Sequence, residues 1–250
     1  MKKIICAALF CSCALAAAAL SITDPFFMPK KNEVTAYASF ANTNKDFNLG
    51  NSTGLFADVS IGVEDNLTLG FGLGWADMHH ISSGLQDPVL HGRYRFFDSL
   101  ADGYFLDLAG SLSPELFDSP YNGDGGSAKG ATSLGIAGLI GSDQIMKNVT
   151  LGAKLAIDYQ AKTQSGCEGS IWSAKGFGKV YITDKHSVEG GVLLKSYFFG
   201  ENVFGYGFSF DYSAEIIPQQ FALVPYLEIE GHNKGYGFGN VWGLKAKYLF

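Results

Sequence analysis

Cysteine and basic charge are both scarce in this chain of 250 residues. Of its four cysteines, Cys6, Cys11 and Cys13 stand in an N-terminal apolar run. Without that run Cys167 is alone, and one thiol cannot form an intramolecular disulfide or, by itself, a metal site. Two lysines precede that run, and without them 16 of the 18 basic residues remain against 24 acidic ones, a net charge of −8. This balance argues against nucleic acid as a partner, because binding it requires a concentrated basic face.

Helical periodicity is almost absent after about residue 21. In its place, 32 glycines and 14% aromatic residues recur in short alternating runs. Such runs suit a sheet-rich protein and suit a long helical one badly. The length allows one large domain or two small ones.

Residues 1–21 have the pattern of a secretory signal peptide. Two lysines precede an apolar run from Ile4 to about Leu15, and small residues suited to cleavage follow at 17–21. A retained membrane anchor is the alternative, but no basic stop signal follows the run. A lipoprotein anchor at Cys11 or Cys13 lacks the usual preceding leucine and small-residue triplet. We therefore expect cleavage near residue 21.

The remaining chain divides into a short leader and one domain. Pro25 and Pro29 bracket a segment that cannot easily join a sheet. We therefore expect a periplasmic N-terminal leader at 22–32 and a single domain over 33–250.

Runs of about ten residues alternate in polarity from residue 33 onward, with clusters of Gly, Asn, Asp and Ser between them. Ten residues is the length of a tilted strand that crosses a membrane. Every second connection is turn-like, whereas those at 41–53, 77–87 and 114–129 are longer, as in barrels with short periplasmic turns. Twelve strands are predicted, at about 33–41, 54–63, 67–76, 88–97, 104–113, 130–141, 149–159, 170–182, 187–198, 205–213, 221–230 and 236–250.

Charge is confined to one face of these strands. Alternate side chains of a strand point to opposite faces, and a charge on the lipid face of a barrel costs about 2–4 kcal/mol at the midplane. The apolar parity, for example Leu67, Leu69 and Phe71, carries no charge. The inward, pore-lining candidates are Asp58, His91, Arg93, Arg95, Asp107, Lys154, Asp158, Lys175, Lys179, Glu189, Lys195, Asp211, Glu228, Glu230, Lys245 and Lys247.

Periodicity alone does not say which face is outside, because a soluble two-sheet sandwich can show the same alternation. The signal peptide, the missing disulfides and the C-terminal strand favour the membrane. That strand carries Trp242, Leu244, Tyr248 and the terminal Phe250 on one parity. It resembles the last strand of Gram-negative outer-membrane β-barrels, which the barrel-assembly machinery recognises in that family. The predicted fold is therefore all-β, a single antiparallel up-and-down transmembrane β-barrel of about twelve strands.

A second resemblance lies inside the chain. A Gly-x-x-Asp step, Gly84 to Asp87, enters a strand that ends in Tyr94 and Arg95. This is similar to outer-membrane barrels described as phenol meta-pathway transporter-like. The resemblance implies an outer-membrane protein that passes small solutes, in contact with outer-membrane lipid and lipopolysaccharide.

Three functions are compatible with such a barrel. The first is a passive channel for small solutes, and the second is a structural or adhesive barrel plugged by its own ion pairs. The third, a lipid hydrolase at the rim, would need a nucleophile and base that no Ser, His and acid spacing singles out. His79 and His80 fit solvated loop residues better than a metal site, which needs three or four ligands. His91 fits a hydrogen-bonded wall residue better than a pH gate.

No enzyme activity, catalytic residue, cofactor or metal is expected. Gly-rich stretches such as 70–74, 123–126 and 235–239 lack the strand–turn–helix context of phosphate loops. Aromatic residues near strand ends are expected to form interfacial girdles. These are Tyr104, Phe105, Tyr159, Trp172, Tyr197, Phe198, Phe199, Tyr248 and Phe250.

Overall fold

The computed structural model describes residues 20–45, 51–78, 82–116, 132–161, 169–199, 201–233 and 238–250. Nearly all of the predicted signal peptide lies outside these ranges and stays a prediction. So do His79, His80, Cys167 and most of the predicted 114–129 loop.

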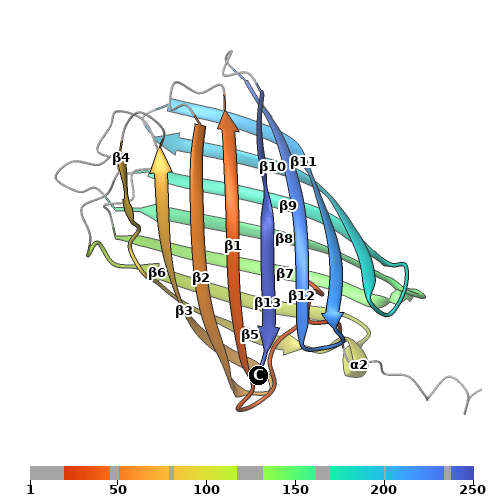
Figure 1. Cartoon of the computed structure of the whole chain (residues 1–250). Helices are drawn as coiled ribbons and strands as arrows, with labels where there is room; N and C mark the ends of the chain where they lie inside the picture. Colours follow the sequence, from red (N-terminus) through yellow and green to blue (C-terminus); the bar gives the residue numbers. More distant parts are fainter. Residues whose placement is uncertain are drawn as a thin grey trace, which may run out of the picture.

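Thirteen strands form one antiparallel sheet (Figure 1). All twelve predicted strands are present, and most extend beyond the predicted bounds. The 41–53 connection is mainly strand, with only 46–50 between β1 and β2. The strands are β1 Val34–Lys45, β2 Asn51–Glu64, β3 Leu67–Met78, β4 Ser82–Leu85, β5 Val89–Phe97, β6 Phe105–Ser113, β7 Ser133–Met146, β8 Val149–Gln160, β9 Gly169–Tyr181, β10 His186–Phe199, β11 Glu201–Ile217, β12 Phe221–His232 and β13 Phe238–Leu249.

The sheet closes on itself. Apart from β4 and β5, consecutive strands pair with each other. β1 pairs with β13 over eleven residues, from Thr35 opposite Leu249 to Lys45 opposite Gly239. The short β4 pairs with the upper part of β3, while β5 pairs with its lower part. These two strands share one place in the ring, so the wall has twelve positions. The prediction of a twelve-stranded up-and-down barrel is confirmed.

The short turns gather at one end of the barrel, the lower end in Figure 1, with the C-terminus and helix α2, Ser99–Asp102. Asp98 caps α2 through Leu100 N at 3.0 Å, and Gly103 ends it at φ 81°. All four register shifts of the ladder lie at this end as well. Short turns mark the periplasmic end of such barrels.

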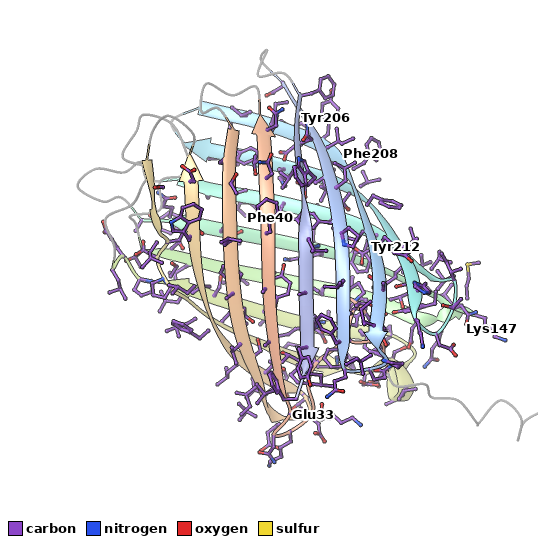
Figure 2. The ribbon with its side chains drawn as sticks, in the orientation of Figure 1. Glu33, Phe40, Lys147, Tyr206, Phe208 and Tyr212 are labelled. Atoms are coloured by element: carbon purple, nitrogen blue, oxygen red, sulfur yellow. The ribbon has the colours of Figure 1, made fainter. Side chains whose placement is uncertain are left out.

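The outer wall is apolar, as the alternation predicts. Tyr206 and Phe208 on β11 point away from the wall (Figure 2) and are 47% and 66% exposed. Leu155 on β8 and Ile136 on β7 are exposed to a similar degree. So much exposed apolar surface requires an apolar surrounding. No helix in the described part of the chain is long and apolar enough to cross a membrane.

Candidate functional site

The interior of the barrel holds a cavity of about 520 Å³. Every strand except β4 contributes to its lining, so the cavity lies at the centre of the ring. Its wall is mostly polar or charged, with small residues such as Gly110 and Gly135 between the charged ones. Ten of the sixteen predicted inward residues line it: Asp58, His91, Arg93, Lys154, Asp158, Lys179, Glu189, Asp211, Lys245 and Lys247.

The other six inward residues lie around this cavity. Arg95 and Asp107 are buried at the short-turn end. Lys175 on β9 contacts Glu189 at 2.7 Å. Lys195, Glu228 and Glu230 form a group of their own on β10 and β12.

The floor of the cavity is the segment before β1, here called the N-terminal segment and defined as residues 20–30. Ile22 and Phe26 are completely buried, and Met28 is 8% exposed. Contacts of the segment reach β5, β9 and β13, which are separate parts of the ring. It therefore lies inside the wall at the short-turn end. The sequence predicted a periplasmic N-terminal leader over 22–32, and the compartment of this segment stays a prediction.

Gly62 on β2 is the point where the N-terminal segment enters the barrel. Asn32 N donates to Gly62 O at 2.8 Å, and Gly62 N donates to Glu33 O at 3.0 Å. A Cβ at Gly62 would lie 2.0 Å from Lys30 O, so only glycine leaves room for the crossing backbone. Lys31 Nζ then reaches Glu64 at 2.9 Å, and this hydrogen bond raises the pKa of Lys31.

Phe26 anchors the segment in an aromatic recess. Its ring stacks on Phe105 at 4.7 Å between centroids and lies 5.9 Å from Phe177. Gly141 lies directly against this ring, because a Cβ there would come within 2.5 Å of it. Burying a whole phenyl side chain is worth about 1.5–3 kcal/mol, enough to hold a short segment in place.

Two arginines fix the backbone of the segment from β5. Arg93 donates to Pro25 O at 3.0 Å, and Arg95 donates to Phe26 O. Both guanidinium groups also bind Asp107 on β6, which is 1% exposed. A carboxylate buried to this degree is stable only because two cations satisfy it.

Asp24 holds the segment from its other side. It is 3% exposed, and its Oδ2 accepts hydrogen bonds from Thr150 Oγ1 at 2.9 Å and from the Tyr181 hydroxyl. The Phe26 N–H donates to Oδ1 at 2.8 Å. Lys179 Nζ donates to Thr23 O at 2.5 Å, next to this carboxylate.

Above the segment, ion pairs line opposite parts of the wall. Lys245 on β13 meets Asp211 on β11 at 2.6 Å. Lys154 and Asp158, both on β8, are exposed to the cavity. The Lys245–Asp211 pair joins strands two places apart in the ring and therefore runs along the wall.

Glu230 on β12 is the centre of a polar cluster nearer the loop end. It is 2% exposed and accepts from Lys195 Nζ at 3.0 Å and from the Tyr197 hydroxyl at 2.7 Å. His232 Nε2 lies 2.9 Å from the same carboxylate. The cluster links β10 and β12 across the intervening strand β11.

His91 lies inside the barrel and is hydrogen-bonded, as predicted for a residue of the inner wall. Its Nε2 is 2.5 Å from Asp58 Oδ2, and Ser60 Oγ donates to Asp58 Oδ1 at 2.9 Å. Serine and histidine therefore share one carboxylate, whereas a catalytic triad needs the serine bonded to the histidine. No cluster of three or more His, Cys, Asp or Glu side chains that could hold a metal ion occurs among the described residues.

Two residues of the expected aromatic girdle face inward. Phe105 is 2% exposed against Phe26, and Tyr197 binds Glu230. The girdle prediction is therefore wrong for both. Tyr104, Tyr159, Trp172, Phe198 and Phe250 are exposed on the outer wall.

The fold of the chain is similar to that of several solved structures. No family model matches the chain, and no curated protein is similar to it. Among solved structures, an outer-membrane channel of Pseudomonas putida F1 described as COG4313 superposes with a TM-score of 0.73 at 12% identity, over 92% of this chain and all of that one. The present chain has the fold of an outer-membrane β-barrel. The NanC porin is also similar, with a TM-score of 0.57 at 12% identity over 85% of this chain and 98% of that one.

A third similar structure is the KdgM porin in complex with disordered oligogalacturonate, with a TM-score of 0.52 at 11% identity over 85% of this chain and 98% of that one. At such identities the likeness concerns the fold. The resemblance to outer-membrane barrels inferred from Phe250 and the alternating strands is thereby confirmed. Fold and apolar outer wall together make this an outer-membrane protein.

Several residues of the interior escaped the sequence analysis. Glu215 is 4% exposed and accepts from Ser21 Oγ; its parity with Asp211 on β11 would have revealed it. Phe105 and Tyr197 likewise share parity with Asp107 and Lys195. Asp24 gave no such signal, since it lies in no strand.

Proposed function

We propose that the protein is a passive outer-membrane channel for small solutes, narrowed at its periplasmic end by its own N-terminal segment. One observation carries the proposal. The twelve strand positions surround a cavity of about 520 Å³ whose lining includes ten ionisable residues, instead of a packed apolar core. Eight-stranded barrels are filled by their side chains and sixteen-stranded ones hold open channels, so a partly filled lumen suits twelve strands.

The sixteen predicted inward residues would line the path of the solute. Both cations and anions occur among them, so a solute would meet both signs of charge. Apart from its chain connection to β1, the N-terminal segment is held by hydrogen bonds and one aromatic anchor. It can therefore act as a removable floor of the cavity. We assign no enzymatic step to the channel.

Single-channel conductance in planar bilayers tests the proposal. The refolded mature protein is compared with Phe26→Ala, which removes the anchor of the segment. We expect small or rare openings in the wild type and larger or longer ones in the variant. Silence of both proteins at every voltage would refute the channel.

A plugged structural barrel is the second candidate, and the segment inside the lumen is the observation that favours it. In that case the outer loops, including 114–129, would meet other surfaces. Deleting that loop should then abolish adhesion while folding stays intact. The conductance experiment separates the two functions, because a structural barrel stays closed in both proteins.

A further inference from the structure

The carboxylate of Asp24 is bound by hydroxyl groups and interacts at longer range with cations from three strands of the barrel. Arg93, Lys179 and Lys247 all interact with it through their charges, and Lys179 Nζ also donates to the O atom of the adjacent Thr23 at 2.5 Å. They come from β5, β9 and β13, which are the fourth, eighth and twelfth positions of the ring. The three strands that carry these cations are therefore spaced evenly around the ring.

The cations make few other contacts that would remain if the N-terminal segment left. Lys179 is 1% exposed, and its Nζ bonds to Thr23 O, Thr23 Oγ1 and Ser213 Oγ. Lys247 Nζ lies 4.6 Å over the Phe27 ring. Arg93 would keep Asp107 but lose Pro25 O. Departure of the segment thus removes one acceptor from Arg93 and two from Lys179. Asp107 would still neutralise Arg93, and Glu189, Asp211 and Glu215 would remain in the surroundings of Lys179.

The hydroxyls around Asp24 are also fixed by the wall. Thr150 on β8 is fully buried and Tyr181 ends β9. Both donate to the same carboxylate oxygen. Two hydroxyl donors and three cations, all from strands, make a site of the kind that holds a carboxylate.

We propose that Arg93, Lys179 and Lys247, with the hydroxyls of Thr150 and Tyr181, form a binding site for small organic carboxylates, which Asp24 occupies when the N-terminal segment is seated. A carboxylate solute competes with Asp24 and so favours release of the segment. The inference rests on the proposed channel and names the solutes that would open it.

Competition follows from linkage. A ligand that binds only the barrel with the segment released shifts the equilibrium toward that state by its differential affinity. The wall then supplies the same donors to the solute that it supplied to Asp24. A neutral solute of the same shape has no such advantage.

Thiol accessibility measures release without requiring conduction. Met28→Cys, in a Cys167→Ser background, places a thiol at a position that is 8% exposed in the seated segment. Its reaction with iodoacetamide is followed in detergent with benzoate, with benzyl alcohol and with sodium chloride at equal concentration. We expect benzoate to accelerate the reaction and the two controls to leave it unchanged. Equal rates with all three additives would overturn the proposal.

Two substitutions locate the site. With Lys247→Gln, the benzoate concentration that gives half the effect should rise about tenfold, the factor that corresponds to about 1.4 kcal/mol. Lys245→Gln is the matched control on the same face of β13, and it should leave that concentration unchanged because Lys245 pairs with Asp211. An equal response of both variants would place the benzoate effect elsewhere.

Asp24→Asn tests the competition itself. The amide keeps the shape of the side chain but removes the charge that the three cations attract. We expect faster basal labelling at Met28→Cys and a half-effect concentration of benzoate about tenfold lower. Unchanged labelling in this variant would show that Asp24 is no competitor. If bilayers stay silent while these shifts occur, the channel fails and the carboxylate site stands.

Discussion

Asp107 shows how a single residue organises the lower lumen. It is 1% exposed, yet it binds both Arg93 and Arg95, and these arginines in turn hold the carbonyl groups of Pro25 and Phe26. The carboxylate thus orients two guanidinium groups toward a segment it does not touch. Charge buried in a barrel is tolerated when each group has a partner of opposite sign.

Replacing Asp107 should therefore destabilise the barrel. Asp107→Asn leaves Arg93 without its ion-pair partner and Arg95 with only Asp98, at 3.4 Å. Loss of one partner of a buried pair costs about 3 kcal/mol. Urea unfolding of the protein in lipid vesicles measures this change. Asp158→Asn is the control, because Asp158 is exposed in the cavity. Its effect should stay within about 0.5 kcal/mol, and equal losses in both variants would contradict the account.

At the scale of elements, the N-terminal segment and β2 depend on one crossing point. The backbone of residues 29–30 runs so close to Gly62 that a side chain there would collide with Lys30 O. The crossing directs the chain from the wall into the lumen. Any residue larger than glycine would force the two backbones apart.

Gly62→Ala should therefore loosen the segment. We expect faster iodoacetamide labelling at Met28→Cys and longer channel openings, because the hydrogen bonds of Asn32 and Glu33 to Gly62 would break. Gly138→Ala serves as control, since a Cβ at Gly138 meets nothing within 4 Å. Identical labelling rates in the two variants would show that the crossing does not hold the segment.

The last strand, β13, carries the proposed assembly signal. Trp242, Leu244 and Phe250 are exposed on the outer wall, whereas Tyr248 is half-buried and contacts Phe250 at 4.6 Å between ring centroids. The side chain of Phe250 is 71% exposed and lies at the end of the ladder. It therefore contributes little to the stability of the folded barrel.

Phe250→Gln should reduce assembly in cells without harming the folded protein. We expect less barrel in the outer membrane, because the machinery would lose its terminal aromatic contact. Refolding of the purified variant into detergent should match the wild type. Immunoblots of outer-membrane fractions measure the first effect, and a normal amount of barrel would contradict the assembly signal.

At the scale of the whole molecule, each side chain of the wall suits the medium that it faces, lipid outside and water inside. Leu155 and Ala156 are neighbours on β8, but Leu155 is 66% exposed on the outer wall and Ala156 lines the cavity. The same charge should therefore have different costs at the two positions. Adjacent residues of a strand point to opposite faces, so each neighbour meets a different medium.

Leu155→Arg should cost about 2–4 kcal/mol of unfolding free energy, the penalty for a charge at the midplane of the lipid face. Ala156→Arg, its matched neighbour, reaches the wet cavity and should cost less. Urea titration in vesicles of equal lipid composition compares the two. A larger loss for Ala156→Arg would reverse the assignment of inside and outside.

The sequence alone was sufficient to predict the strands and their faces. The period of two in a strand is local, so each charged residue from Asp58 to Lys247 could be assigned to a face without knowing its partners. The cost of charge in lipid then decided which face was outside. Phe105 and Tyr197 were misplaced because their aromatic character was weighed above their parity.

Only the tertiary structure decided what fills the lumen. The N-terminal segment has no periodicity. Asp24 binds Thr150 and Phe26 contacts Phe177, and both partners lie more than a hundred residues further along the chain. Such contacts exist only after β1 has paired with β13. Local pattern fixes which way a side chain points, whereas closure of the wall determines what it meets there.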